Sequence, residues 1–437
     1  MIEHADVVIA GGGASGLAAA AELGMSSADL NVVIIEKNNE PGKKIRATGS
    51  GRCNITNTRA EGYNEILRFF TGIGLMTRTY ENGLVYPYSE SAADVAELLT
   101  ARAIELGTRI VTGAEVTGVR FGENGGFETE YVTASAKGKR RHVISSDHVI
   151  LALGSKAGPS YGCTGDGYAI ARSLGHSIVT PVPVLTGIEC REWDKDAEPC
   201  AITLAGTRSR GEVILSKVNL EKCSNDRRDG TDCSNGSDRS DIELFKEKGE
   251  IQFTRYGLSG ICVFNMTRHM RYDRSAGESI ADFKVTADLF PDGDIAQFLR
   301  DRRSNAFPGE KAADVLRTVL KENIAEYVIA RAGRNAGAEN LASENVSEMS
   351  DKDISALADA VHRLEFRPSG IRGWKEAQAA MGGVDLREID AATNKSLLAE
   401  GLYITGELAD RDYECGGFNL SNAWLTGIRA ADAISSK

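Results

Sequence analysis

Hydrophobic residues fill positions 7–10, a glycine cluster follows at 11–13, and an alanine-rich run begins at Ala14. An unbroken apolar run is typical of a strand that is buried on both faces, and the alanine-rich run favours a helix. A second apolar run covers residues 31–35 and ends at Glu36. The pattern predicts a strand, a tight loop, a helix and a second strand, the opening unit of a parallel α/β sheet.

The glycines of the loop stand at 11, 13 and 16, which is the spacing of a dinucleotide fingerprint. Gly11 permits the turn, Gly13 lets the backbone approach a pyrophosphate, and Gly16 lets the helix pack on the strand. The helix start at Ala14 and Ser15 offers N–H groups to the phosphates. The same spacing rule predicts that Glu36 and the adjoining Lys37 lie at the ribose, the alternative being a surface glutamate at a strand end.

The far end of the chain favours FAD over NAD, which the fingerprint alone does not distinguish. Residues 400–407 read as a short strand that ends at Gly406 and Glu407, and Glu407 is placed to hold a ribityl chain. A helix follows, with apolar residues at helical spacing from Leu420 onwards. Its N-terminus near Gly417, Asn419 and Leu420 would stabilise the negative charge that a reduced flavin carries. The alternative is a glycine-rich turn before a terminal packing helix.

The loop at residues 41–57 is basic, rich in glycine and dense in hydrogen-bond donors. It follows the second strand, at the edge of the sheet where ligands bind. We predict that it wraps the pyrophosphate and reaches the flavin through Lys44, Gly51, Arg52, Cys53 and Asn54, the alternative being an exposed basic loop. Since Arg52 adjoins Cys53, the sequence also predicts a lowered pKa for that thiol.

The middle of the chain alternates helical and extended patterns. Helices are predicted at 92–106, after Asp166 (a candidate cap) up to 174, at 294–303, at 311–332 with a break, and at 355–362. Strands are predicted at 114–120, 127–133, 142–144, 147–154 and 364–367, and a glycine turn at 381–384. Gly154 is expected to end a buried strand near the cofactor, and Val116 is expected to contact adenine through its backbone, by analogy with related flavoproteins. Residues 222–241 are polar and read as a mobile excursion.

Three motifs resemble the BaiN-like (aminoacetone-oxidase-like) family of bacterial NAD(P)/FAD-dependent oxidoreductases. They are G-K-K-I-x-x-x-G-S-G-R-C-N-I-T-N at 42–57, G-C-T-G-D-G-Y at 162–168, and G-L-Y-I-T-G-E with C-G-G-F-N-L at 401–420. The resemblance implies bound FAD, a Rossmann-like FAD domain split in sequence, an inserted β-barrel-like domain and a small helical subdomain. The expected fold class is α/β. We expect the FAD domain at 1–187 and 364–437, the β-rich insert at 188–290 and the helical subdomain at 291–363.

Composition narrows the possible partners. The net charge of −11 argues against a nucleic-acid surface, and no apolar run approaches the roughly 20 residues of a membrane span. The charged N-terminus enters a strand at once, which predicts a cytoplasmic protein without a signal peptide. Eight cysteines include no C-x-x-C pair, so we expect free thiols and no metal site. The oligomeric state is left open.

These observations predict an FAD-dependent oxidoreductase that passes hydride through flavin N5, with NAD(P)H-linked reduction of a small organic substrate. Since no second G-x-G-x-x-G is present, NAD(P)H would visit transiently. A flavin-dependent oxidase of a small amine, an FAD-dependent RNA modifier and a non-catalytic flavin sensor remain alternatives. No catalytic acid or base is assigned, because no cluster of histidines and acids stands out.

Overall fold

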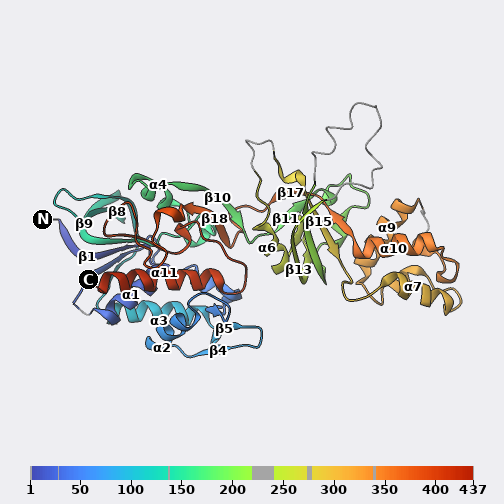
Figure 1. The fold of residues 1–437 in the computed structure, drawn as a ribbon, viewed down its shortest axis with the longest axis horizontal. Coiled ribbons are helices and arrows are strands. Elements are labelled where there is room, and N and C mark those ends of the chain that lie inside the picture. The colour runs from blue at the N-terminus through green and yellow to red at the C-terminus, as the bar shows by residue number, and fades with distance from the viewer. Residues whose placement is uncertain are drawn as a thin grey trace. The chain divides into compact units, whose positions relative to one another are not determined.

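The structure is a computed structural model that describes residues 2–27, 29–135, 138–218, 241–272, 278–337 and 341–436. The chain forms two compact units, one of Met1–Val184 with Trp374–Lys437 and one of Leu185–Gly373 (Figure 1). The finer division into four segments stays a prediction, and nearly all of the polar segment at 222–241 lies outside the described residues.

The first unit is built on a seven-stranded sheet in the order β6-β2-β1-β9-β8-β7, with β19 also paired to β9. Its strands are β1 (Glu3–Ala10), β2 (Val32–Ile35), β6 (Arg109–Val111), β7 (Ala114–Phe121), β8 (Phe127–Ser135), β9 (Gly138–Leu151) and β19 (Leu402–Ile404). The pairs β1–β2, β1–β9, β2–β6 and β9–β19 are parallel. The predicted α/β fold with a Rossmann-like sheet is confirmed.

Both faces of β1 are covered, which explains its unbroken apolar sequence. Val7 and Ile9 pack towards α1 (Ala14–Ser26), α3 (Ala92–Glu105) and α11 (Phe418–Ser435). Val8 and Ala10 pack towards a second cluster that includes β7, β8 and α4 (Asp166–Ser173). Helices α1 and α11 lie side by side in Figure 1, although some 400 residues of chain separate them.

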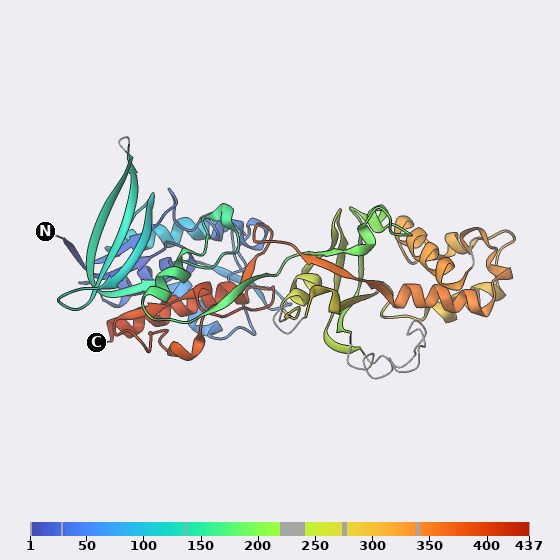
Figure 2. The same cartoon turned by 90° about the horizontal axis from the view of Figure 1, so that it is seen from above.

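Two predictions about the strands are corrected. Residues 142–144 and 147–151 belong to one strand, β9, because its first part pairs with β8 while its last part lies between β1 and β19. Residues 152–154 of the predicted strand lie beyond its end. Figure 2 shows the long β8–β9 hairpin, whose two strands are part of this sheet. The expected glycine turn at 381–384 is strand β18 (Ala379–Val384), paired with β10 (Ile178–Val184) across a bulge. Gly382 has a φ of +93°, and a Cβ there would lie 2.5 Å from the Thr180 carbonyl oxygen. The bulge therefore requires glycine at this position.

Smaller elements complete this unit. They are the three-stranded sheet β3 (Thr56–Asn57), β5 (Leu84–Pro87) and β4 (Thr77–Thr79), the helix α2 (Tyr63–Gly72), and the 3-10 segments η1 (Ile45–Gly51), η2 (Pro159–Tyr161), η10 (Leu386–Glu388) and η11 (Gly406–Leu408).

The second unit holds a sheet in the order β16-β15-β12-β13-β14-β11-β17. Its strands are β11 (Ile188–Cys190), β12 (Arg208–Lys217), β13 (Ile242–Phe253), β14 (Gly257–Ser259), β15 (Phe283–Asp288), β16 (Leu364–Phe366) and β17 (Pro368–Ile371). The two edge strands, β16 and β17, are separated by Arg367 alone, so the sheet must curl towards itself. Among the described residues no ladder joins these edges. The sheet is therefore barrel-like and open.

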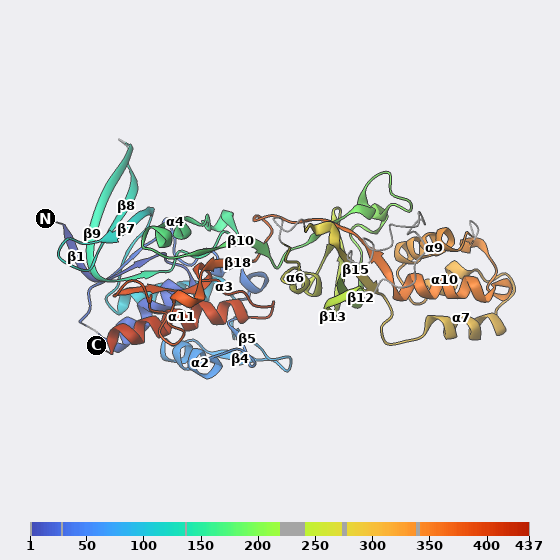
Figure 3. The same cartoon turned by 45° about the horizontal axis from the view of Figure 1, so that its top comes forward.

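Helices pack at one end of this sheet, as Figure 3 shows for α7, α9 and α10. The helical elements are α6 (Ile261–Thr267), α7 (Ile295–Ser304), α8 (Ala312–Leu316), α9 (Glu322–Ala336), α10 (Asp351–His362), and the 3-10 segments η3 (Arg191–Trp193), η4 (Ala201–Leu204), η7 (Ile280–Asp282), η8 (Leu341–Ser343) and η9 (Val346–Glu348). The break predicted within 311–332 falls between α8 and α9. One hydrophobic cluster joins the sheet to these helices. No helix among the described residues is both long and apolar enough to cross a bilayer.

A buried hydrogen-bond chain fixes the segment that precedes β19. His176 Nδ1 lies 3.1 Å from Glu388 Oε2, and His176 Nε2 lies 2.9 Å from the Ser396 hydroxyl. That hydroxyl also accepts the backbone N–H groups of Leu398 and Ala399, so its own proton is left for Nε2. Burial lowers the pKa of His176, and the Glu388 carboxylate only partly offsets this. The chain is therefore complete with a neutral imidazole.

We expect this histidine to make the first unit less stable in acid. The folded-state pKa lies below the ordinary value of 6.5, so only the unfolded chain takes up a proton as the pH falls through 6.5. The contribution of neutral His176 is complete above that pH and is lost below it. Urea unfolding at about pH 8 and about pH 5 should show the loss in the wild type. The variant His176→Gln should be less stable at the higher pH and lose less on acidification; an equal loss in both proteins contradicts the assignment.

Candidate cofactor site

The glycine loop between β1 and α1 contains two positions that have no room for a side chain. A Cβ on Gly16 would lie 2.0 Å from the carbonyl oxygen of Gly11. A Cβ on Gly11, whose φ is +105°, would lie 2.5 Å from the carbonyl oxygen of Ala152 on the neighbouring strand. Gly13 is different, since no atom lies within 4 Å of an added Cβ. The loop thus leaves open space beside Gly13, at the N-terminus of α1.

Glu36 reaches back to this loop from the end of β2. Its side chain is 7% exposed, Oε2 accepts the N–H of Gly12 at 2.8 Å, and Oε1 accepts the N–H of Asn38 at 2.7 Å. A carboxylate has about four acceptor positions, so these bonds orient it and leave acceptor capacity for hydroxyl groups. The geometry suits a ribose-binding acid.

Lys37 is tied to the motif at 162–168. Its Nζ lies 2.7 Å from Asp166 Oδ2 and also contacts the Thr164 hydroxyl. Burial alone would raise the pKa of Asp166, but the bonds from Lys37 and Thr164 outweigh it, and the pKa is lowered. Asp166 does not cap α4 as predicted, because Gly165 stands at the N-cap and the carboxylate turns to Lys37 instead.

The loop at 41–57 is compact and has an unusual backbone. Ser50 and Cys53 both have a φ of +57°, and Gly49 and Gly51 lie in the left-handed region as well. Such conformations are unfavourable for residues with a Cβ and are concentrated at functional sites. Gly51, like Gly13, has no atom within 4 Å of an added Cβ. The loop therefore exposes a second stretch of open backbone.

An ion pair links this loop to the C-terminal part of the chain. Lys44 Nζ lies 2.7 Å from Glu407 Oε2, and the two side chains are 28% and 15% exposed. Burial opposes the charge on Lys44, but Glu407 more than offsets this, so the pKa of the lysine is raised. The hydroxyl of Ser155 lies 3.3 Å from the same carboxylate oxygen. Residues 363 positions apart thus meet in one polar cluster.

Further ties join the same two segments. The hydroxyls of Thr56 and Ser421 lie 2.7 Å apart, Trp424 Nε1 donates to the Ile55 carbonyl at 3.0 Å, and Asn57 Nδ2 donates to the Gly416 carbonyl at 3.1 Å. None of these residues is among the predicted cofactor residues. Both segments are rich in small hydroxyl and amide side chains, which indicates hydrogen bonding. The local sequence does not show which of these side chains pair with one another.

The start of α11 adds a helix N-terminus to this cluster. Gly417 is the N-cap with a φ of +95°, and a Cβ there would lie 2.9 Å from the Thr56 carbonyl oxygen. Asn419 binds the preceding loop, since its Nδ2 donates to the Tyr413 carbonyl and its Oδ1 accepts the Tyr413 N–H. Leu420 packs on the core beneath. The first N–H groups of the helix are left for an acceptor outside it.

The remaining predicted residues frame the same edge of the sheet. Val116 lies on β7 and is buried. Gly154 follows β9 with a φ of +68° and has no atom within 4 Å of an added Cβ. Ala14 and Ser15 begin α1, and a Cβ on Gly406 would lie 3.0 Å from the Ser15 hydroxyl. Gly406 donates its N–H to the Thr426 hydroxyl at 2.9 Å. Every predicted position is thus in the first unit.

The predicted lowering of the pKa of the Cys53 thiol is wrong. Its side chain is fully buried, and burial raises the pKa of the thiol to about 12. Arg52 does not lower it, because its guanidinium lies over the Tyr86 ring and pairs with Glu90. Cys53 is a neutral packing residue at the base of the loop.

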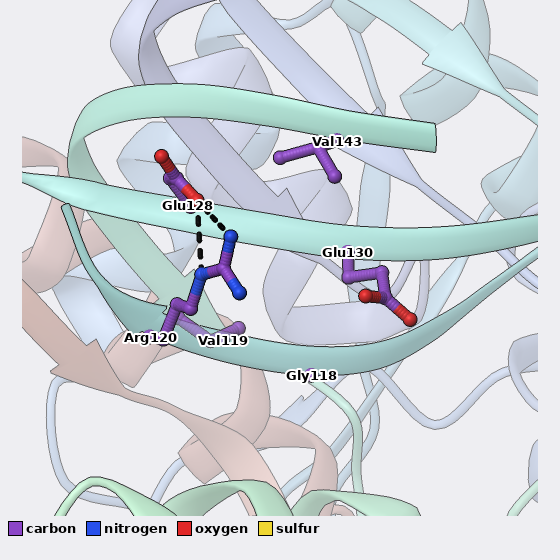
Figure 4. A pocket seen from close by; sticks show the side chains of 6 residues that line it. All are labelled: Gly118, Val119, Arg120, Glu128, Glu130 and Val143. Carbon is purple, nitrogen blue, oxygen red and sulfur yellow. Dashed lines mark hydrogen bonds and ion pairs between the residues drawn. The ribbon is translucent and has the colours of Figure 1, made fainter. Parts of the chain in front are cut away.

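A hollow of about 100 Å³ lies elsewhere, on strands β7, β8 and β9 (Figure 4). Arg120 and Glu128 span it through an ion pair, with Arg120 Nε 2.9 Å from Glu128 Oε2. Its lining includes none of the predicted cofactor residues. Open backbone, rather than a hollow lined by side chains, marks the candidate site.

The family model for the HI0933-like protein Rossmann domain matches residues 5–64 and 60–433. The chain belongs to this family. The resemblance to the BaiN-like flavin oxidoreductases that the motifs indicated is confirmed by a second comparison. The chain is 31% identical over 454 residues to the 3-dehydro-bile acid delta(4,6)-reductase of Clostridium scindens, with 98% of each chain covered.

Two further relatives match from end to end. They are the ribosomal RNA dihydrouridine synthases of Escherichia coli, at 25% identity, and of Haemophilus influenzae, at 24% identity, with 100% of each chain covered. Relatives that align with the chain along nearly its whole length thus carry names that describe different substrates.

The buried thiol of Cys53 should not react in the folded protein. We expect iodoacetamide at about pH 8 to alkylate the partly exposed Cys415 while Cys53 stays unmodified until denaturant is added. Peptide mass spectrometry of native and unfolded samples measures both sites. Modification of Cys53 in the native protein as fast as that of Cys415 would show that the loop opens or that the thiol is ionised.

Proposed function

We propose that the protein binds FAD in an extended conformation along the candidate cofactor site and acts as an oxidoreductase. The observation that carries the proposal is the open space beside Gly13, Gly51 and Gly154, three backbone positions on separate segments. Glu36 lies at one end of this set of glycines, and the N-terminus of α11 lies at the other end. Such an arrangement suits a long ligand with a ribose, a pyrophosphate and an anionic ring edge.

Each part of the cofactor has a group of residues to hold it. We assign Glu36, Lys37 and Val116 to the adenosine, Gly11, Gly13, Ala14, Ser15 and Gly16 to the pyrophosphate, Lys44, Gly51, Arg52, Asn54 and Gly154 to the middle, and Gly406, Glu407, Gly417, Asn419 and Leu420 to the ribityl and flavin end. The buried Cys53 packs beneath the middle group and supports its loop.

FAD, when bound, supplies a centre that accepts and donates hydride. The protein's part is to bind and orient it. The N-terminus of α11 would stabilise negative charge on the ring edge, and the Lys44–Glu407 pair would present both a donor and an acceptor to the chain between ring and phosphate.

The reaction we propose is the NAD(P)H-linked reduction of a carbon–carbon double bond conjugated to a carbonyl group in a small organic molecule. In the net reaction, NAD(P)H and a proton add two hydrogen atoms across the double bond, and NAD(P)⁺ is released. The support comes from the relatives, because a delta(4,6)-reductase and a dihydrouridine synthase are both named for saturating such a bond. A small molecule is favoured by the net charge of −11.

Uridine in RNA is a second candidate substrate. The full-length match to two ribosomal RNA dihydrouridine synthases favours it. The two candidates are separated by mixing purified holoenzyme anaerobically with NADH or NADPH and then with a 3-oxo-delta(4,6) steroid, a simple cyclic enone or ribosomal RNA that lacks dihydrouridine. Mass spectrometry detects the gain of two hydrogen atoms. If none of these is reduced although the flavin is, the conjugated-alkene reaction is wrong.

Filling the open space at Gly13 should remove FAD binding without unfolding the protein. In Gly13→Val the new side chain meets no protein atom at its Cβ and the backbone stays in an extended conformation, so the loss of stability should be limited to the poorer N-cap, about 1 kcal/mol. The side chain would occupy the place of the pyrophosphate, and we expect FAD affinity to fall at least about tenfold. Flavin fluorescence titration of apoprotein and urea unfolding measure the two effects.

Gly118→Val is the matched control, because Gly118 on β7 also has open space around its Cβ and lies outside the assigned site. It should keep both stability and FAD affinity. Gly16→Ala should instead lose stability, by about 1–3 kcal/mol, since its Cβ would clash with the Gly11 carbonyl. Wild-type FAD affinity in Gly13→Val would overturn the proposed cofactor path.

A further inference from the structure

The strands β4 and β5 form a small ribbon in the first unit (Figure 1). One of its faces carries aromatic and arginine side chains that the proposed cofactor path does not use. The strands pair with Arg78 opposite Tyr86. Because side chains alternate between the faces of a strand, Arg78 and Tyr80 share a face with Tyr86 and Tyr88. We call these four residues the Tyr–Arg face.

The members of the face contact one another. The guanidinium of Arg78 lies 4.5 Å from the centre of the Tyr88 ring and 5.9 Å from that of Tyr80. The rings of Tyr80 and Tyr86 meet edge to face at 5.6 Å, and Arg52 covers Tyr86 at 4.9 Å. These contacts hold the planar groups in place before any ligand arrives, which lowers the entropy lost on binding.

The outer part of the face is accessible. Tyr88 is 53% exposed, and Arg78 is exposed as well. Exposed tyrosine rings and guanidinium planes offer stacking surfaces for a base, and guanidinium groups also bind phosphate.

The face adjoins the loop assigned to the middle of the cofactor and is linked through β3 to the segment before α11. Val85 on β5 donates its N–H to Asn54 Oδ1, and a Cβ on Gly49 would lie 3.4 Å from the Tyr86 ring. Strand β5 also pairs with β3, whose Asn57 binds the Gly416 carbonyl just before α11. A ligand stacked on the face would therefore lie next to the loop assigned to the middle of the cofactor.

The charge of the face fits a small anion better than a polymer. Arg52 is paired with Glu90 at 3.8 Å. Within the described part of the chain, no carboxylate lies within ion-pair distance of Arg78. One arginine without a carboxylate partner suits the few phosphates of a dinucleotide, whereas a long polyanion needs many such contacts.

We propose that the Tyr–Arg face binds the adenosine diphosphate part of the transient nicotinamide dinucleotide, with the adenine on Tyr88 and a phosphate at Arg78. The inference rests on the proposed NAD(P)H-linked function and assigns a binding site to the nicotinamide dinucleotide. It also fits the sequence, which has only one dinucleotide fingerprint.

The test uses FAD-loaded protein and the variants Tyr88→Ala, Tyr88→Phe and Arg78→Ala. Anaerobic stopped-flow reduction of the flavin gives the apparent Kd and the limiting rate for NADH and for NADPH. We expect Tyr88→Ala to raise the Kd roughly fivefold or more, with the limiting rate changed less than about twofold, and Tyr88→Phe to restore binding because it keeps the ring. Arg78→Ala should raise the Kd and weaken its dependence on salt.

Matched controls are Arg68→Ala, which removes an exposed arginine from α2, and Phe121→Ala, which removes an exposed ring from β7. Both should keep the wild-type Kd. The inference is wrong if Tyr88→Ala and Arg78→Ala also keep it, or if they weaken binding of RNA or of the reducible substrate instead.

A second measurement separates this inference from the proposed function. Calorimetric titration of the oxidised holoenzyme with NAD⁺ and NADP⁺ reports binding without turnover. If the wild type binds a dinucleotide through Tyr88 but its flavin is not reduced by NADH or NADPH, the Tyr–Arg face stands and the proposed electron donor fails. If the wild type neither binds nor is reduced, both fail.

Discussion

The candidate cofactor site depends on how closely α11 packs against α1. A Cβ on Gly427 in α11 would lie 2.2 Å from the Ser15 carbonyl oxygen in α1, so the two backbones are almost in contact. Small residues on α1, among them Ala18 and Ala19, allow this approach and are buried. Because each helix begins at the carboxyl edge of the sheet, bringing the helices together also brings together the glycine loop and the segment that holds Glu407.

The contact between α1 and α11 brings the two segments close together, and hydrogen bonds and an ion pair then fix their relative position. The Thr426 hydroxyl accepts the Gly406 N–H, and the Lys44–Glu407 pair joins the basic loop to the end of β19. Buried polar groups are costly unless they are paired, so each tie disfavours any other register between the two segments. The buried histidine chain at His176 adds a further anchor just before β19. The site is thus specified by contacts between segments hundreds of residues apart.

This explains which features the sequence could predict. The first strand, loop and helix follow from local pattern, and so do the helices at 92–106 and 355–362, because periodicity and glycine spacing are local signals. The pairing of Thr56 with Ser421 has no such signal. Cys53 shows a subtler limit: Arg52 is its neighbour in sequence, yet the left-handed backbone at Cys53 sends the two side chains to different places. Adjacency therefore predicted the wrong pKa.

The glycines of the site are of two kinds, and the difference between them affects which ligands the site can bind. At Gly11, Gly16 and Gly427 a side chain has no room, because backbone meets backbone. At Gly13, Gly51 and Gly154 there is room that the chain leaves unused. The first set brings the segments together, and the second leaves space for a ligand beside the main chain along the resulting edge. A surface made of main-chain groups recognises phosphates and polar ring edges, which many cofactors share, rather than the shape of one substrate. Relatives that match the chain from end to end carry names for a bile acid and for ribosomal RNA, and a site built from main-chain groups places no demand on which of these substrates is used.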